Sequence, residues 1–170
     1  MFENSGIKSE TNWKPLASTD KECFACGPEN SHGLRMCFES NGRQIRSKLV
    51  VKKTFRGWSN LIHGGILSTM LDETMSWAVI KFTGKFMLTR SMTVTFKKPV
   101  HVGSALTAIG YVKKQSSERK AEVVAEIRDE DGDICAVSEG DFALFSKKHF
   151  LRMGIMPEED IEAMASAISD

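Results

Sequence analysis

The sequence predicts an α+β fold, with one long helix followed by a run of long strands. Two patterns carry this prediction. Between His63 and Ile80 apolar residues recur at helical spacing, and Asp72 and Glu73 are the charged residues of that stretch. From residue 87 to residue 145, segments of alternating apolar and polar residues are separated by turn residues. With 170 residues and 41% apolar content, the chain is long enough for one well-packed domain and too short for two ordinary ones.

The order of the expected elements follows from the turn and stop signals. We expect a polar N-terminal extension over residues 1–22, one domain over 23–147 and a helical tail over 148–170. The helix should begin near His63 and end before Gly84, a residue suited to a left-handed helix stop. Asn41-Gly42 predicts a two-residue hairpin turn with positive φ. The expected strands cover residues 34–39, 43–51, 87–97, 104–114, 120–128 and 134–145.

The tail carries its own helix signal. Pro157 is followed by three acidic residues, Glu158, Glu159 and Asp160. Acidic side chains stabilise the first turn of a helix, where the helix dipole is positive. Ile161, Met164 and Ile168 then recur at core-facing spacing. We expect this helix to pack on the domain or on a neighbouring subunit.

Charge and hydropathy exclude two classes of partner. A net charge of +1 without a basic run gives no electrostatic support for nucleic-acid binding. The chain shows neither a basic start followed by an apolar run nor about 18 consecutive apolar residues. The sequence therefore predicts no membrane span, and a cytoplasmic location by default.

Two glycines open the expected helix. Each costs about 1 kcal/mol relative to alanine, so Gly64 and Gly65 suggest that bare backbone N–H groups are useful there. Such groups at the positive end of a helix dipole suit an oxyanion. A tight entry turn capped by His63 is the equally plain structural alternative.

Asp72 lies opposite the apolar face of the helix. Its neighbours on that side are Ser68, Thr69, Ser76 and Val79, small residues without the cations expected four positions away on a solvated face. This pattern predicts a surface for close packing with a carboxylate in it. The alternative is an exposed acid on an ordinary surface helix.

His63 and Asp72 are separated by nine positions, which is about 180° around a helix and about 13 Å along it. They cannot easily meet in one site of one chain. If both act on one substrate, a second copy of the helix must supply one of them, across a twofold axis.

The motifs resemble those of a known family. They are Cys23-Phe24-Ala25-Cys26-Gly27 with Gly33-Leu34, Phe55-Arg56-Gly57-Trp58 leading into His63-Gly64-Gly65, Asp72-Glu73, and Thr89 through Pro99. Over residues 23–146 the chain resembles the hotdog-fold acyl-CoA thioesterases of the phenylacetyl-CoA thioesterase-like (PaaI-like) branch. The resemblance implies one long central helix wrapped by an antiparallel sheet, in a homodimer that pairs into a tetramer.

The resemblance also implies roles in hydrolysis of an acyl-CoA thioester. Asp72 would be the base or nucleophile that brings water to the thioester carbon. The Gly64 N–H would contact the carbonyl oxygen of substrate held by the partner subunit, with His63 shaping that contact. Thr89 matches a strand hydroxyl that holds the water, although an ordinary strand residue is an equal alternative.

Substrate contacts are expected around this centre. Candidates are Gly65, Asn60, Trp58, Lys97 and Lys98, the lysines for the coenzyme A phosphates, with Lys113 and Lys114 as further cations. No cofactor is expected, since coenzyme A is part of the substrate. The chain departs from relatives at Gly57, where several carry Asn or Gln against the thioester carbonyl.

Cys23, Cys26, His32 and Cys37 have the spacing C-x2-C-x5-H-x4-C, close to a zinc knuckle but one residue too long before the histidine. Reduced thiols that bind no metal are favoured. For the whole domain, hydrolysis is favoured over a non-catalytic thioester-binding or regulatory role. Dehydration is disfavoured because no second acid-base residue lies beside Asp72.

Overall fold

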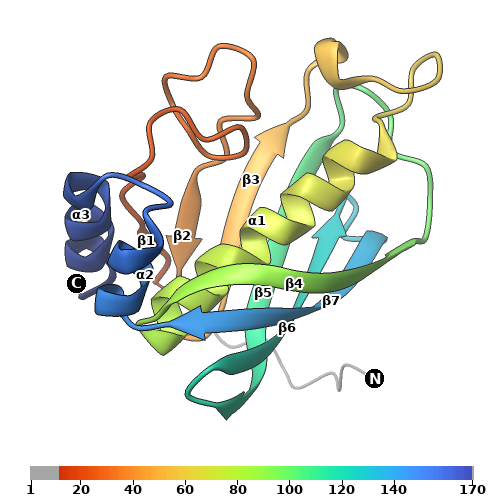
Figure 1. Ribbon diagram of the computed structural model, residues 1–170. Helices are drawn as coiled ribbons and strands as arrows, with labels where there is room; N and C mark the ends of the chain where they lie inside the picture. The colour runs from red at the N-terminus through yellow and green to blue at the C-terminus, as the bar shows by residue number, and fades with distance from the viewer. Residues whose placement is uncertain (1–11, 170) are drawn as a thin grey trace.

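The computed structural model describes residues 12–169 and contains one seven-stranded antiparallel sheet that curves around a central helix (Figure 1). The order of strands in the sheet is β1-β2-β3-β5-β6-β7-β4. This is the α+β hotdog architecture predicted from the sequence. The strands are β1 (Lys14–Pro15), β2 (Phe38–Ser40), β3 (Ile45–Val50), β4 (Phe86–Phe96), β5 (Ala105–Ser117), β6 (Lys120–Arg128) and β7 (Ile134–Phe145). The helices are the 3-10 turn η1 (Lys53–Phe55), α1 (Gly64–Thr83), α2 (Lys147–Met153) and α3 (Glu158–Ser169).

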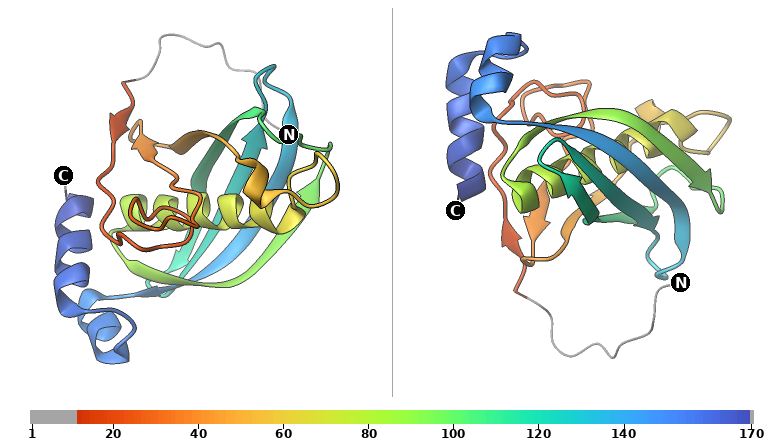
Figure 2. Two further views of the ribbon diagram at one scale, coloured as in Figure 1. Left: turned by 90° about the horizontal axis from the view of Figure 1, so that it is seen from above. Right: turned by 60° about the horizontal axis from the view of Figure 1, so that its bottom comes forward.

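Helix α1 has the predicted bounds and lies within the curve of the sheet (Figure 2). His63 caps its start, and Gly84 ends it with a left-handed φ of 64°. Every residue from Thr74 to Ile80 is buried, so the second half of α1 is covered on all sides. Two residues of the predicted close-packing surface around Asp72, Ser76 and Val79, are buried within this chain. No helix among residues 12–169 is long and apolar enough to cross a membrane.

Strands β3 to β7 lie close to the expected ranges, whereas β1 was not expected and β2 covers only the end of the expected strand over residues 34–39. Two turns also differ. Ser40 pairs with Ile45, so the first hairpin has a four-residue loop instead of two residues, in which Gly42 takes a φ of 85°. The Asn41 side-chain oxygen accepts hydrogen bonds from the backbone N–H groups of Arg43 and Gln44. These two bonds stabilise the wider turn. Strands β5 and β6 are joined more tightly than predicted, because β5 continues to Ser117.

The C-terminal segment packs on the end of the sheet, as Figure 1 shows. Helix α2, which was not predicted from the sequence, begins at a Ser146 cap. Phe150 from α2 stacks on Phe86 with ring centroids 4.9 Å apart, and Ile161 of α3 is fully buried beside them. The predicted packing of the tail on the domain is confirmed for Ile161, whereas the side chain of Ile168 lies outside the described residues.

Candidate functional site

The start of α1 leaves one backbone donor free. The Gly65 N–H donates to Nδ1 of His63 at 2.9 Å, so this donor is already used by the cap. The Gly64 N–H has no acceptor among residues 12–169. It lies at the positive end of the α1 dipole and is available to an oxyanion. Of the two predicted glycine donors, the structure therefore leaves the one at Gly64 open.

Asp72 is held in place by the neighbouring strand. Thr89 on β4 donates its hydroxyl to Oδ1 of Asp72 at 2.8 Å. Asp72 is partly buried and Thr89 is exposed, so the carboxylate keeps contact with solvent. The structure thus brings these two predicted residues together, with the second carboxylate oxygen left for another partner.

The two ends of the predicted site stay apart within one chain. Gly64 and Asp72 are eight residues apart on α1, or about 12 Å. Strand β4 runs beside both positions, because a Cβ on Gly64 would lie 3.3 Å from the Phe96 ring and Thr89 contacts Asp72. Among the described strands β4 is at the edge of the sheet, paired only with β7. Both ends of the site therefore lie next to an unpaired strand edge.

The loop before α1 is built around Gly57. A Cβ at Gly57 would lie 3.2 Å from Cα of His63, so this residue lets the loop pack against the capping histidine. Trp58, a candidate for substrate contact, is 87% exposed in this chain. Asn60 is also exposed, and its carbonyl accepts from Val102 N–H at 2.8 Å. Neither side chain meets Asp72 in the described chain.

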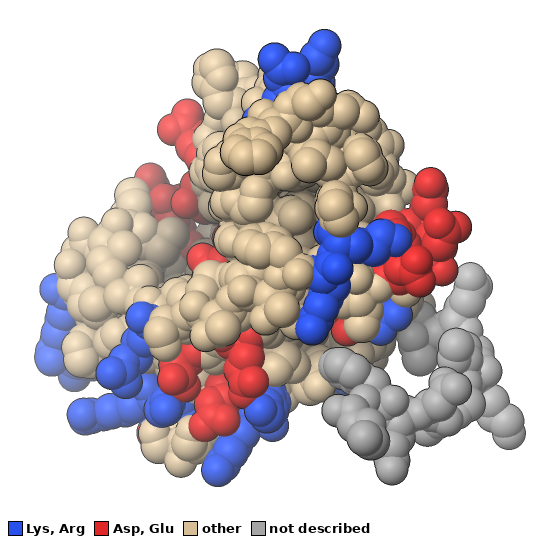
Figure 3. Space-filling model, turned by 90° about the vertical axis from the view of Figure 1, so that its right-hand side faces the viewer, with Lys and Arg blue, Asp and Glu red and all other residues tan. Residues whose placement is uncertain are grey.

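The candidate lysines differ in their partners. Lys98 contacts Asp129 at 2.5 Å and Asp133 at 3.1 Å, and these hydrogen bonds raise its pKa. Its charge is therefore compensated within this chain, and a contact with the coenzyme A phosphates stays a prediction for Lys98. Lys97 is exposed at the end of β4, close to the start of α1. Figure 3 shows this side of the molecule, where a broad uncharged area has charged side chains gathered at its margins.

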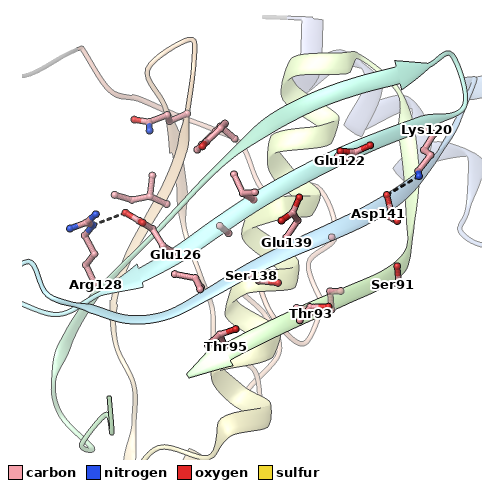
Figure 4. Close-up of a pocket in the computed structure, with 18 residues that line it drawn as sticks. Ser91, Thr93, Thr95, Lys120, Glu122, Glu126, Arg128, Ser138, Glu139 and Asp141 are labelled. Atoms are coloured by element: carbon pink, nitrogen blue, oxygen red, sulfur yellow. Dashed lines mark hydrogen bonds and ion pairs between the residues drawn. The ribbon is translucent and has the colours of Figure 1, made fainter. Parts of the chain in front are cut away.

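A hollow lies on the face of the sheet that points away from α1 (Figure 4). Its labelled side chains are polar, and two pairs of them are in contact: Lys120 with Asp141 at 3.1 Å and Arg128 with Glu126 at 2.6 Å. None of the predicted site residues lines it.

Next to Asp72, a cluster that the sequence analysis missed joins Cys23, Cys26 and Glu73. Burial, followed by the charge of Cys23, raises the pKa of Glu73 to about 7. A hydrogen bond from the Cys26 thiol lowers the pKa of Cys23 to about 5, and the same contact raises that of Cys26.

His32 and Cys37 are exposed and outside this cluster, so the four-residue knuckle is not assembled. The signal available in the sequence was Glu73 itself, a carboxylate at the edge of the apolar face with no cation at helical spacing. Sequence spacing alone could not place it beside cysteines 50 residues away.

Comparisons with known proteins place this geometry in context. Residues 59–136 match the thioesterase superfamily. VdlD of Helicobacter pylori is 36% identical over 86 residues, which cover 48% of this chain and 49% of VdlD. The match therefore spans about half the length of this curated relative.

Two solved structures show the same fold. The E. coli PaaI protein from the phenylacetic acid degradation operon has a TM-score of 0.60 at 20% identity, over 66% of this chain and 81% of PaaI. A hypothetical thioesterase from Streptococcus pneumoniae, solved with coenzyme A, has a TM-score of 0.58 at 17% identity, over 62% of this chain and 80% of that one. At these identities the likeness shows a shared fold.

Proposed function

We propose that the protein hydrolyses an acyl-CoA thioester to the free acid and coenzyme A. The match of residues 59–136 to the thioesterase superfamily and the fold shared with PaaI support this proposal. The observation that carries the proposal is the Asp72–Thr89 contact beside an unpaired strand edge. It gives a solvent-accessible carboxylate with a fixed orientation, which is what activation of a water molecule requires.

The proposed reaction uses two groups with opposite tasks. Asp72 accepts a proton from water as the water oxygen attacks the thioester carbon. The Gly64 N–H stabilises the negative charge that develops on the carbonyl oxygen. When the carbon–sulfur bond breaks, the coenzyme A sulfur leaves with the electron pair and takes up a proton. Thr89 positions the carboxylate through its hydrogen bond. No cofactor is needed.

A twofold dimer would complete the site. If β4 pairs antiparallel with the β4 of a second copy near Met92 and Thr93, the Thr89 end of one strand lies opposite the Phe96 end of the other. Thr89 contacts Asp72, and Phe96 lies against Gly64. This pairing would therefore bring the carboxylate of one subunit toward the free N–H of the other, and it would remove the exposed strand edge.

The direct test is hydrolysis of a panel of acyl-CoA thioesters, short-chain, long-chain and aromatic, followed with a thiol-trapping dye. We expect turnover of at least one acyl class well above the rate without protein. Saturable binding of the same thioesters, measured by calorimetry, without any release of thiol would instead establish a non-catalytic binding role.

We expect Lys97→Ala to raise KM for the acyl-CoA substrate by about 3- to 10-fold with little change in kcat. The exposed ammonium at the end of β4 is available to a phosphate, and a single exposed charge contributes about 1 kcal/mol. Steady-state kinetics measure this change. The matched control is the same acyl group on N-acetylcysteamine, which has no phosphates and should show no effect. An equal effect on both thioesters would contradict phosphate recognition by Lys97.

A further inference from the structure

The cluster of Cys23, Cys26 and Glu73 is separate from the proposed reaction. The two cysteines lie in the loop before β2, and Glu73 lies on α1, one residue after Asp72. One ligand atom from each residue, two sulfurs and a carboxylate oxygen, lies within 4.8 Å of the other two. Thiolates and carboxylates at this separation are a ligand set that zinc accepts.

The distances are close to those of a tetrahedral centre. With zinc–sulfur bonds of about 2.3 Å and zinc–oxygen bonds of about 2.1 Å, a sulfur and an oxygen ligand are about 3.6 Å apart. The Cys23 sulfur and Oε1 of Glu73 are 3.8 Å apart. Little movement is needed for both atoms to bind one ion.

The loop that carries the cysteines is held in a shape suited to metal binding. The Gly27 N–H donates to the Cys23 carbonyl at 2.9 Å, which closes a tight turn around the two sulfurs. Only glycine fits after the second cysteine, because a Cβ there would lie 2.4 Å from the Cys23 nitrogen. Hydrogen bonding from the backbone N–H groups of Cys26 and Ala25 lowers the pKa of the Cys23 thiol, which favours its thiolate form.

A hydrogen bond orients the Glu73 side chain, but none of the groups that most affect its pKa balances its negative charge. The Trp77 indole N–H donates to its Oε1 at 3.2 Å, a contact of the kind that orients metal-binding carboxylates. The described groups that act most strongly on Glu73 are Cys23, Cys26, Trp77 and Asp72, and none of these is a cation. Partly buried negative charge without a cation is unfavourable, and a divalent ion would supply the missing charge.

We propose that Cys23, Cys26 and Glu73 bind one zinc ion, with a water molecule as the fourth ligand. The ion ties the loop around residues 21–27 to α1 and so stabilises the segment next to Asp72. This role is structural and takes no part in the proposed hydrolysis. The sequence pattern favoured non-ligating thiols, because its spacing offers His32 and Cys37 as the remaining ligands and does not place Glu73 near the cysteines.

The test is metal analysis of the full chain purified under reducing conditions without chelators. Mass spectrometry of the digested protein should find about one zinc per chain. Cys23→Ser and Cys26→Ser should lose the metal, and Glu73→Gln should weaken zinc binding by about tenfold or more in competition with a chromophoric chelator. Cobalt in place of zinc should give sulfur-to-metal charge-transfer absorption that the cysteine variants lack.

Two matched controls separate this site from the four-residue knuckle. Cys37→Ser and His32→Ala change exposed residues outside the cluster, so both should retain the metal and the cobalt spectrum. Circular dichroism must show that each variant is folded, and Glu73→Gln, the mildest change, carries the test if the cysteine variants fail to fold. Failure of wild-type protein to take up added zinc would overturn the proposal. A Cys23–Cys26 disulfide persisting under reducing conditions, or loss of zinc in the His32 variant, would also overturn it.

Discussion

Replacement of Asp72 by asparagine is expected to lower kcat by about 100-fold or more, because an amide cannot accept the proton that attacking water must lose. The fold should be unaffected. An asparagine oxygen can still accept the 2.8 Å hydrogen bond from Thr89, so the side chain keeps its position. Hydrolysis assays at saturating substrate, with thermal unfolding as a check on folding, measure the effect.

Thr89→Val provides the matched comparison, since it removes the hydroxyl and leaves the Asp72 carboxylate unchanged. A positioning role predicts a smaller loss of kcat for this variant than for Asp72→Asn. Retention of more than about a tenth of wild-type kcat by Asp72→Asn would remove this carboxylate from the mechanism.

Mixing two inactive variants should restore about a quarter of wild-type activity per subunit. One variant is Asp72→Asn, and the other is Gly64→Pro, which deletes the free N–H. His63 has a ψ of 134°, the extended conformation that a residue before proline favours, so the helix start should accept the ring. Random exchange makes about half of the dimers mixed, and each mixed dimer has one intact site out of two.

Gly64→Ala is the control for the second variant. It introduces the same Cβ contact, 3.3 Å from the Phe96 ring, but keeps the N–H donor, so it should retain most of the activity. Native mass spectrometry follows subunit exchange. If exchange is complete and the mixture stays inactive, Gly64 and Asp72 do not act across a subunit interface.

The periodicity of apolar residues was sufficient to predict the central helix and most of the strands. The bounds of α1 were predictable because His63 and Gly84 are local stop signals, and local hydrogen bonds decide where a helix begins and ends. Helical spacing predicted a close-packed surface at Ser76 and Val79, but it could not predict which part of the protein covers them. That depends on how far the sheet curves around α1.

The candidate site also has features that the sequence predicts and features that only the tertiary structure sets. The sequence by itself determined which groups lie on α1 and that His63 and Asp72 cannot meet in one chain, because helix geometry sets the angle and distance between them. Three sets of contacts were decided only by the tertiary structure. Thr89 donates a hydrogen bond to Asp72, and Lys98 forms ion pairs with Asp129 and Asp133. Glu73 lies beside Cys23 and Cys26. These contacts join residues 17 to 50 positions apart, and such pairs meet through the packing of strands and loops on the helix. No local pattern in the sequence encodes that packing.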